Sequence, residues 1–319
     1  MSIEAFQGLL GQDKAVELLL RAVELDRVAP AYLFYGSSGI GRTIAARSFV
    51  QLLLTAQLSA DRATLGIKKL QTGNHPDLLW IEPTYLKAGE LYTAKQAAEK
   101  GLQYKTPPKI RIEQIRDLRQ FLQRPALEAK RQAVVIDDAQ TMAEAPANAL
   151  LKTLEEPGNA TLILIAPDTD SLLTTIVSRC QSIQFYRLSS ANLIKVLERQ
   201  GYQEILQDPE LIAIAQGSPG KAIAAWSQLQ LIPEGLIQNL KRSPSSPLEA
   251  LKLAQTVAQL DGQTQLWLID YLQYYYWQRH QYSELMTTWE KTRQYLLRYV
   301  QPRLVWECAL LKLWHHNHA

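Results

Sequence analysis

The chain has 319 residues, more than a single hydrophobic core usually supports, so we expect two or three domains. Apolar residues make up 47% and charged residues 20%, a globular composition that excludes extended disorder. The formal net charge of +3 is too small to indicate a nucleic-acid-binding protein by itself.

The cysteines and the N-terminal sequence indicate a cytoplasmic protein. Cys180 and Cys308 lie far apart, and neither belongs to a metal-ligand spacing such as C-x-x-C. The first residues lack the charged start and apolar run of a signal peptide, and no apolar stretch reaches a membrane-spanning length. We therefore expect neither secretion nor membrane insertion.

The first elements in the chain follow the order helix, strand, glycine loop, helix. Apolar residues at helical spacing between residues 16 and 23 predict an amphipathic helix that ends before Pro30. Residues 31–35 are short, apolar and aromatic, which is typical of a strand. A glycine cluster follows, and residues 43–54 are compatible with a helix.

Two further apolar runs predict buried parallel strands, at residues 133–136 and 161–166, with a helix over residues 148–154 between them. Alternating strands and helices indicate an α/β sheet. Residues 82–109 turn polar and contain two glycines and a Pro-Pro pair, so they form a long excursion whose shape the sequence does not assign.

From about Ser189 the pattern is helical to the end of the chain. Breaks at residues 217–220 and 243–247 predict two smaller helical domains. The tyrosines of residues 271–276 lie among leucines, which favours a packed core over a platform for stacking bases.

A phosphate-loop pattern follows the first strand. The glycines would turn backbone N–H groups toward phosphate oxygens, the following helix would point its positive end at them, and Thr43 would hold Mg²⁺. The candidate nucleotide-binding residues here are Gly36, Ser37, Ser38, Gly39, Ile40, Gly41, Arg42 and Thr43.

Arg42 stands where this pattern carries a lysine. A planar guanidinium does not substitute simply for a compact ammonium at the β- and γ-phosphates, so nucleotide binding is compatible with lost hydrolysis. The alternative is a glycine turn between strand and helix that holds no ligand.

An acidic pair, Asp137 and Asp138, ends the apolar strand of residues 133–136. NTPases place a magnesium carboxylate and a water-orienting acid at such a strand end. Asp138 is one methylene shorter than the glutamate expected there, which would displace a positioned water. A simple pair of polar residues capping a strand is the alternative interpretation.

Several short motifs together resemble the bacterial clamp-loader AAA+ family, from the N-terminus to about residue 223. They are Gly11-Gln12, Ala31-Tyr32-Leu33-Phe34, Gly73-Asn74-His75-Pro76-Asp77, residues 148–157 and Ser178-Arg179-Cys180. In that family the Ser-Arg-Cys motif supplies an arginine finger to the adjacent subunit's nucleotide site, so the resemblance assigns this trans-acting catalytic role to Arg179.

The departures from the family pattern favour a supporting subunit over a motor subunit. Motor subunits carry lysine in the loop, Asp-Glu in the acidic pair and arginine at the fourth position of the lid's Gly-Ser-x-Arg, where this chain has Gly220. ATP and Mg²⁺ are therefore the ligands considered, with weak or absent turnover. Residues 54–73 contain no cysteine, so the family's zinc module is not expected.

The resemblance implies a RecA-like AAA+ module with a parallel sheet over residues 1–187, a helical lid over 188–232 and an all-helical collar over 233–319. It implies a hetero-pentamer with motor subunits and the delta subunit, acting on a sliding clamp and primed DNA.

Two other functions remain open on the sequence. One is a self-sufficient AAA+ ATPase that tolerates Arg42 and Asp138. The other is a DNA-binding module built on a basic run, although such a run is more often a solvated helix face. Its residues are Arg111, Arg116, Arg119, Arg124, Lys130 and Arg131.

Overall fold

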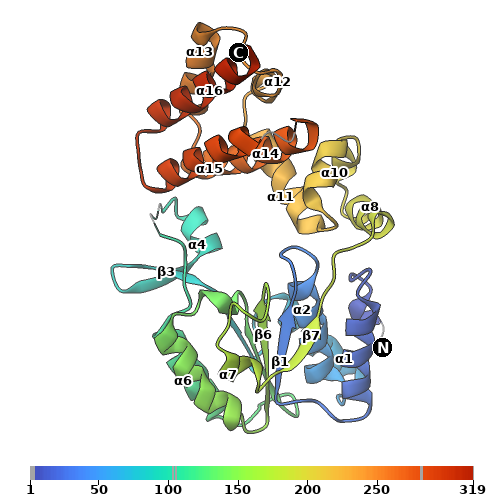
Figure 1. Cartoon of the computed structure of the whole chain (residues 1–319). Coiled ribbons are helices and arrows are strands. Elements are labelled where there is room, and N and C mark those ends of the chain that lie inside the picture. Colours follow the sequence, from blue (N-terminus) through green and yellow to red (C-terminus); the bar gives the residue numbers. More distant parts are fainter. Residues whose placement is uncertain (1–3, 103, 105, 281–282, 319) are drawn as a thin grey trace. The chain divides into compact units, whose positions relative to one another are not determined.

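The computed structural model describes residues 4–102, 104, 106–280 and 283–318. Residue contacts divide the chain into two compact units, Met1–Val196 and Leu197–Ala319, which we call unit 1 and unit 2 (Figure 1). Helix α8 (Ser190–Arg199) runs across the division.

Unit 1 alternates strands and helices. Its helical elements are η1 (Glu4–Phe6), α1 (Asp13–Glu24), α2 (Arg42–Thr55), α3 (Ala60–Gln71), α4 (Ala94–Glu99), α5 (Ile112–Leu122), η2 (Ala139–Thr141), α6 (Glu144–Glu155) and α7 (Thr174–Val177). Its strands are β1 (Ala31–Tyr35), β2 (Leu78–Ile81), β3 (Thr84–Lys87), β4 (Glu90–Thr93), β5 (Gln132–Ile136), β6 (Ala160–Ala166) and β7 (Gln181–Gln184).

The main sheet has five parallel strands in the order β2-β5-β6-β1-β7, which confirms the predicted α/β class. The register pairs Phe34 with Ile165 and Val135 with Ile163. Strand β6 thus lies between β1, which leads into the glycine loop, and β5, which ends at the acidic pair. Since parallel strands end at one edge, this topology brings the loop and the acids together.

Helices cover both faces of the sheet, as expected for strands that are apolar on both sides. On one face Phe49 of α2 packs against the rings of Tyr32 and Phe34, at centroid distances of 5.1 and 6.3 Å. On the other face α5 and α6 contribute buried side chains to a core that includes Leu33 and Val134. Figure 1 shows α1 and α2 on one side of the sheet and α6 and α7 on the other.

The polar excursion of residues 82–109 is folded. It contains the antiparallel hairpin of β3 and β4 followed by helix α4. It closes on itself at its base, where Thr84 pairs with Lys109 through backbone hydrogen bonds of 3.0 and 3.1 Å. The rings of Tyr85 and Tyr104 stack within it at 4.1 Å.

Unit 2 is helical, as predicted. Besides the end of α8 it contains α9 (Gln203–Leu206), α10 (Pro209–Ala215), α11 (Pro219–Gln230), α12 (Leu236–Arg242), α13 (Pro247–Val257), α14 (Gly262–His280), α15 (Ser283–Leu297) and α16 (Pro302–His318). Its core includes Trp289, Trp306 and three of the tyrosines assigned to a core, Tyr271, Tyr275 and Tyr276.

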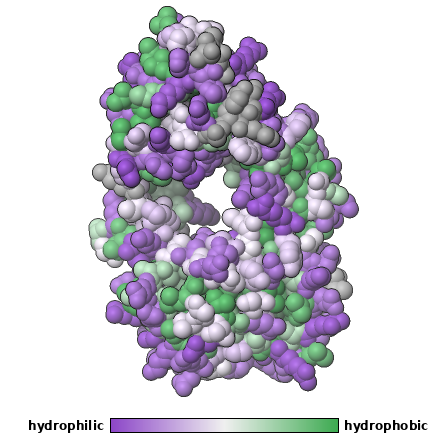
Figure 2. Space-filling model, in the orientation of Figure 1, coloured by the Kyte–Doolittle hydropathy of each residue, from purple (hydrophilic) through white to green (hydrophobic). Residues whose placement is uncertain are grey.

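Among the described residues, no helix is both long enough and apolar enough to cross a membrane. Hydrophilic residues cover much of the visible face of each unit, with apolar residues between them (Figure 2).

Candidate nucleotide site and arginine finger

The glycines of the phosphate loop adopt backbone conformations that other residues rarely take. Gly36, Gly39 and Gly41 have φ angles of +145°, +76° and +105°. A Cβ on Gly36 would lie 2.4 Å from the carbonyl oxygen of Phe185, and one on Gly41 would lie 2.5 Å from Leu9. The loop therefore needs glycine at these positions to turn tightly into α2.

Gln12, in the N-terminal segment, connects the phosphate loop to the residues that follow β7 through hydrogen bonds. The Gln12 amide donates to the carbonyl oxygens of Ile40, at 3.3 Å, and of Tyr186, at 2.7 Å, and accepts from the Tyr186 N–H at 3.0 Å. Gln12 is buried and lines a pocket of about 330 Å³. Nearby, Arg187 donates to the Ser37 hydroxyl at 3.3 Å.

Arg42 lies inside the protein. Its side chain is only 7% exposed, and its Nη1 donates a hydrogen bond to the carbonyl oxygen of Ala166, the last residue of β6. Burial lowers the pKa of Arg42, while the charges of Asp138 and Asp137 oppose that shift. The guanidinium is thus hydrogen-bonded to the backbone of β6 and lies near the negative charges of the acidic pair.

Thr43 and the acidic pair meet at the carboxyl edge of the sheet. The Thr43 hydroxyl donates to Oδ2 of Asp137 at 3.3 Å, and Oδ1 of Asp137 accepts from the Asp138 N–H at 3.0 Å. Burial raises the pKa of Asp137 and the nearby charge of Asp138 adds to the effect, although these hydrogen bonds partly oppose it. Asp138 adopts a left-handed conformation with φ of +49°.

The residues at this site fit the magnesium-binding part of a nucleotide site but not the phosphate-binding part. The hydroxyl of Thr43 and the carboxylate of Asp137 are the oxygen ligands that Mg²⁺ takes. Arg42 does not fit the role of the phosphate-binding lysine, because its donor group is engaged by Ala166. No group of three His, Cys, Asp or Glu residues within the described part of the chain is arranged to hold a metal ion.

Arg179 follows helix α7 and belongs to a second cluster. Its Nη2 pairs with Oε1 of Glu155 at 2.6 Å, and its Nη1 donates to the carbonyl oxygen of Thr175 at 3.0 Å. The side chain is 36% exposed. The neighbouring Cys180 is half-buried, and burial raises the pKa of its thiol to about 12.

The Gly-Ser-Pro-Gly stretch in unit 2 is a helix start. Gly217 has φ of +77°, and the Ser218 hydroxyl accepts from the Lys221 N–H at 3.2 Å, which caps α11. Gly220 therefore lies in the first turn of α11 and offers no side chain toward a ligand.

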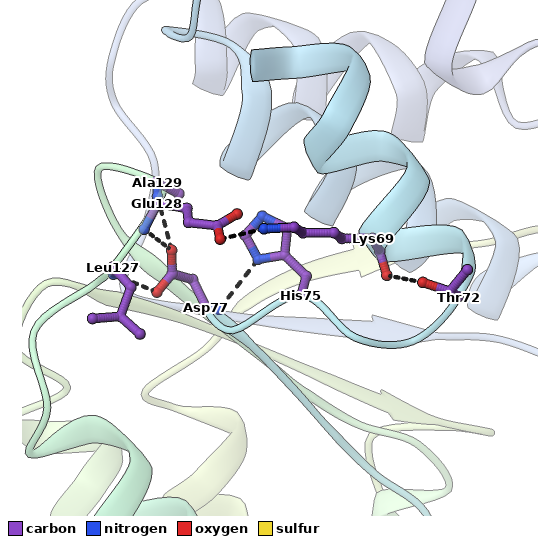
Figure 3. Close-up of polar contacts among 7 residues, drawn as sticks. All are labelled: Lys69, Thr72, His75, Asp77, Leu127, Glu128 and Ala129. Atoms are coloured by element: carbon purple, nitrogen blue, oxygen red, sulfur yellow. Dashed lines mark hydrogen bonds and ion pairs between the residues drawn. The ribbon is translucent and has the colours of Figure 1, made fainter. Parts of the chain in front are cut away.

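The His-Pro-Asp motif lies at the amino-terminal ends of the strands, away from the nucleotide site, because Asp77 directly precedes the start of β2 (Figure 3). Its buried carboxylate accepts three backbone hydrogen bonds, of 2.7, 2.8 and 2.8 Å, from Leu127, Glu128 and Ala129. His75 accepts from the Asp77 N–H at 3.1 Å, and Lys69 pairs with Glu128. This motif holds a loop in place and is not part of the nucleotide site.

The structure gives two members of the basic run partners of their own. Arg119 donates to the carbonyl oxygen of Ala149, and Arg131 lies 3.7 Å from the carboxylate of Asp26. Arg116, Arg124 and Lys130 are exposed.

Comparisons with known proteins cover both units. The family described as "DNA polymerase III, delta subunit" matches residues 11–189. The family described as "Cyanobacterial DNA polymerase III delta prime, C-terminal domain" matches residues 191–313.

Individual relatives carry related names. The chain is 31% identical to DNA polymerase III subunit delta' of Bacillus subtilis over 180 residues, which cover 56% of this chain and 48% of the relative. It is 35% identical to subunit delta' of Pseudomonas aeruginosa over 196 residues, covering 60% and 54%. The chain thus matches about half the length of these relatives.

Among solved structures, a DNA polymerase III gamma subunit-related protein from Thermotoga maritima aligns with 95% of this chain and 99% of its own. The sequence identity is 17% and the TM-score is 0.46.

Proposed function

The chain belongs to the DNA polymerase III delta-subunit family, and from that membership we propose that it is the delta-prime subunit of a clamp loader. In this role it works in the bacterial cytoplasm with motor subunits and delta in a hetero-pentamer. The assembly places a sliding clamp on primed DNA, and this subunit acts as its relatively rigid member.

One observation carries the proposal. Two family matches, over residues 11–189 and 191–313, follow each other along the chain and account for both units. Either match alone would fit a protein that shares one part with a loader subunit. Their succession supports a loader subunit over residues 11–189 and 191–313 of this chain.

The candidate nucleotide site supports a helper rather than a motor. Arg42 is engaged by Ala166, and Gly220 supplies no side chain where a motor has its lid arginine. Thr43 and Asp137 lie within hydrogen-bond distance of each other and supply the kind of oxygen atoms that would hold Mg²⁺. We therefore expect an inherited site of weak or absent ATP turnover, which disfavours the self-sufficient ATPase.

Arg179 is the residue that we propose acts on a neighbouring subunit. The guanidinium is partly exposed and is held by Glu155 on the surface of unit 1. A cation delivered to a γ-phosphate stabilises the charge that spreads over it in the transition state. Delivery requires Arg179 to exchange Glu155 for the phosphate.

Reconstitution with purified motor subunits, delta and clamp tests the proposal. We expect the chain to enter one complex in size-exclusion chromatography and to be required for loading a fluorescent clamp onto primed DNA. The isolated chain should hydrolyse ATP at a small fraction of the rate of the complex.

A mixture that lacks only this chain is the control. Equal clamp loading with and without the chain contradicts the proposal. Rapid ATP hydrolysis by the chain alone, abolished by Thr43→Ala, supports the self-sufficient ATPase instead. Tight DNA binding by the chain alone that weakens steeply with salt favours the DNA-binding module.

A further inference from the structure

We propose that Arg42 is a built-in cation that closes the phosphate loop, so that the protein's own site excludes Mg²⁺-ATP as long as this side chain is present. This inference rests on the proposed function, since it gives a physical reason for the weak or absent ATP turnover expected of a supporting subunit. It reverses the role that the sequence pattern gives to Arg42.

The loop is tied to the end of β6 at both of its ends. Gly36 begins the loop, and its N–H donates to the carbonyl oxygen of Pro167 at 3.1 Å. Arg42 ends the loop, and its side chain donates to the carbonyl oxygen of Ala166. Ala166 is the last residue of β6 and pairs with Tyr35 in the sheet, and Pro167 directly follows it, so both attachments are at the end of one strand of the sheet. The loop therefore holds its fold without a ligand.

The charge of Arg42 also matches its surroundings. Asp137 is half-buried just after the end of β5, the other neighbour of β6, and Asp138 follows it. A carboxylate that is partly withdrawn from water is stabilised by a nearby cation or by hydrogen-bond donors. In an ATP-dependent site Mg²⁺ and a lysine contribute positive charge near such acids. Here a permanently protonated guanidinium contributes it from within the chain.

A nucleotide must therefore compete with a contact that is already made. For Arg42 to serve a phosphate, it must leave the carbonyl oxygen of Ala166, a residue that is fully buried. A buried charged hydrogen bond of this kind is sufficient to weaken nucleotide affinity on the order of 10- to 100-fold. As long as the side chain stays in place, its guanidinium is held at Ala166 beside the charges of Asp138 and Asp137 and does not serve a phosphate.

Nucleotide binding by the full-length chain tests this inference. The probe is a fluorescent ATP analogue with Mg²⁺, titrated with wild type, Arg42→Ala and Arg42→Lys. We expect weak binding by wild type and binding at least about tenfold tighter by both variants. Adding Thr43→Ala to Arg42→Ala should remove the gain, because Thr43 is the proposed magnesium ligand.

Arg62→Ala is the matched control, since Arg62 is an exposed arginine on α3 outside the site, and it should leave binding unchanged. Thermal melting reports whether each variant is folded. If Arg42→Ala does not fold, the test depends on Arg42→Lys, which retains a positive charge. Binding that is unchanged or weaker in the folded variants overturns the inference. Assembly into the loader is measured separately, so failure of the proposed function leaves this result interpretable.

Discussion

Arg179 is anchored by groups that a neighbouring site can replace. Its ion pair with Glu155 is short, at 2.6 Å, but both side chains are substantially exposed, at 36% and 51%. Exposed ion pairs of this kind contribute little to stability. Removing Arg179 therefore separates a catalytic role from a structural one.

We predict that Arg179→Ala leaves the subunit folded and assembled but slows DNA-stimulated ATP hydrolysis by the complex. Arginine fingers are worth about 10³- to 10⁵-fold at the site they serve. Since other sites draw arginines from other subunits, total hydrolysis should fall only in part, whereas clamp loading should fall further. Steady-state ATPase and clamp-loading rates of assembled complexes provide the measurement.

Arg62→Ala is again the control, and it should match wild type in both assays. Unchanged rates for Arg179→Ala would remove the trans role. A large loss of melting temperature would instead make Arg179 a structural residue.

The sequence predicts the backbone of the phosphate loop better than it predicts the contacts of the side chains around it. The glycine pattern predicts the backbone of the loop, because positive φ angles at Gly36 and Gly41 leave few alternatives. It does not predict that Arg42 turns to Ala166, since that contact depends on a strand 124 residues away. Gln12 belongs to a short sequence motif, but its hydrogen bonds to Tyr186 also depend on a part of the chain that is distant in sequence.

At the scale of elements, the buried strands were predictable and the marginal ones were not. Strands β1, β5 and β6 are apolar and almost wholly buried, so their runs of apolar residues stand out. Strand β7 buries only Ile183, and the sequence gives it no strand pattern. The sequence does not reveal the hairpin of β3 and β4 either, because few of its residues are buried and it therefore carries no run of apolar residues.

Helices α10, α12 and α14 meet around a single carboxylate, that of Glu210. It accepts a hydrogen bond from the Tyr271 hydroxyl at 2.7 Å and pairs with Lys241, while Arg279 lies 4.0 Å away. Burial pushes the pKa of Glu210 upward, but the hydrogen bonds from Lys241 and Tyr271 and the nearby positive charges outweigh it and lower the pKa.

We predict that Glu210→Gln lowers the stability of unit 2, by about 1–3 kcal/mol at neutral pH, because a charge-assisted hydrogen bond is lost. The folded-state pKa lies below the unfolded value. The stabilisation is therefore present above the unfolded pKa and is lost as pH falls through the folded value. The difference between variant and wild type should shrink under acidic conditions.

Urea unfolding at several pH values provides the measurement. Tryptophan fluorescence is a suitable probe, because every tryptophan except Trp80 lies in unit 2. Glu234→Gln is the control, since Glu234 is exposed and should show no effect. Equal stabilities of Glu210→Gln and wild type at neutral pH would contradict a stabilising role for this carboxylate.

At the scale of the whole molecule, the predicted division into domains over residues 1–187, 188–232 and 233–319 stays a prediction. The structure groups residues 197–319 into one compact unit. Within it, contacts cross the predicted lid and collar boundary. Glu210 pairs with Lys241, the Thr264 hydroxyl donates to Gln228 at 3.2 Å, and Ile214 packs against the core of the predicted collar. Sequence breaks at glycine and proline mark helix ends, and helix ends alone do not reveal which helices pack together.

We predict that a chain ending at residue 196 folds as a nucleotide module but does not join the loader. Unit 1 holds its complete sheet and core. The truncation removes the helical collar, which the resemblance to the clamp-loader family implies joins the subunits of the ring. A chain ending at residue 234 should also fail to assemble. In addition, it should expose α10 and α11, which lose Lys241, Tyr271 and Thr264 as partners.

Size-exclusion chromatography with partner subunits tests assembly of both truncated chains, and thermal melting with limited proteolysis tests their folding. We expect cooperative melting of both chains and rapid cleavage after residue 196 only in the longer one. Normal complex formation by either truncated chain would remove the predicted collar from the assembly, and loss of cooperative melting in the shorter chain would mean that unit 1 depends on unit 2 to fold.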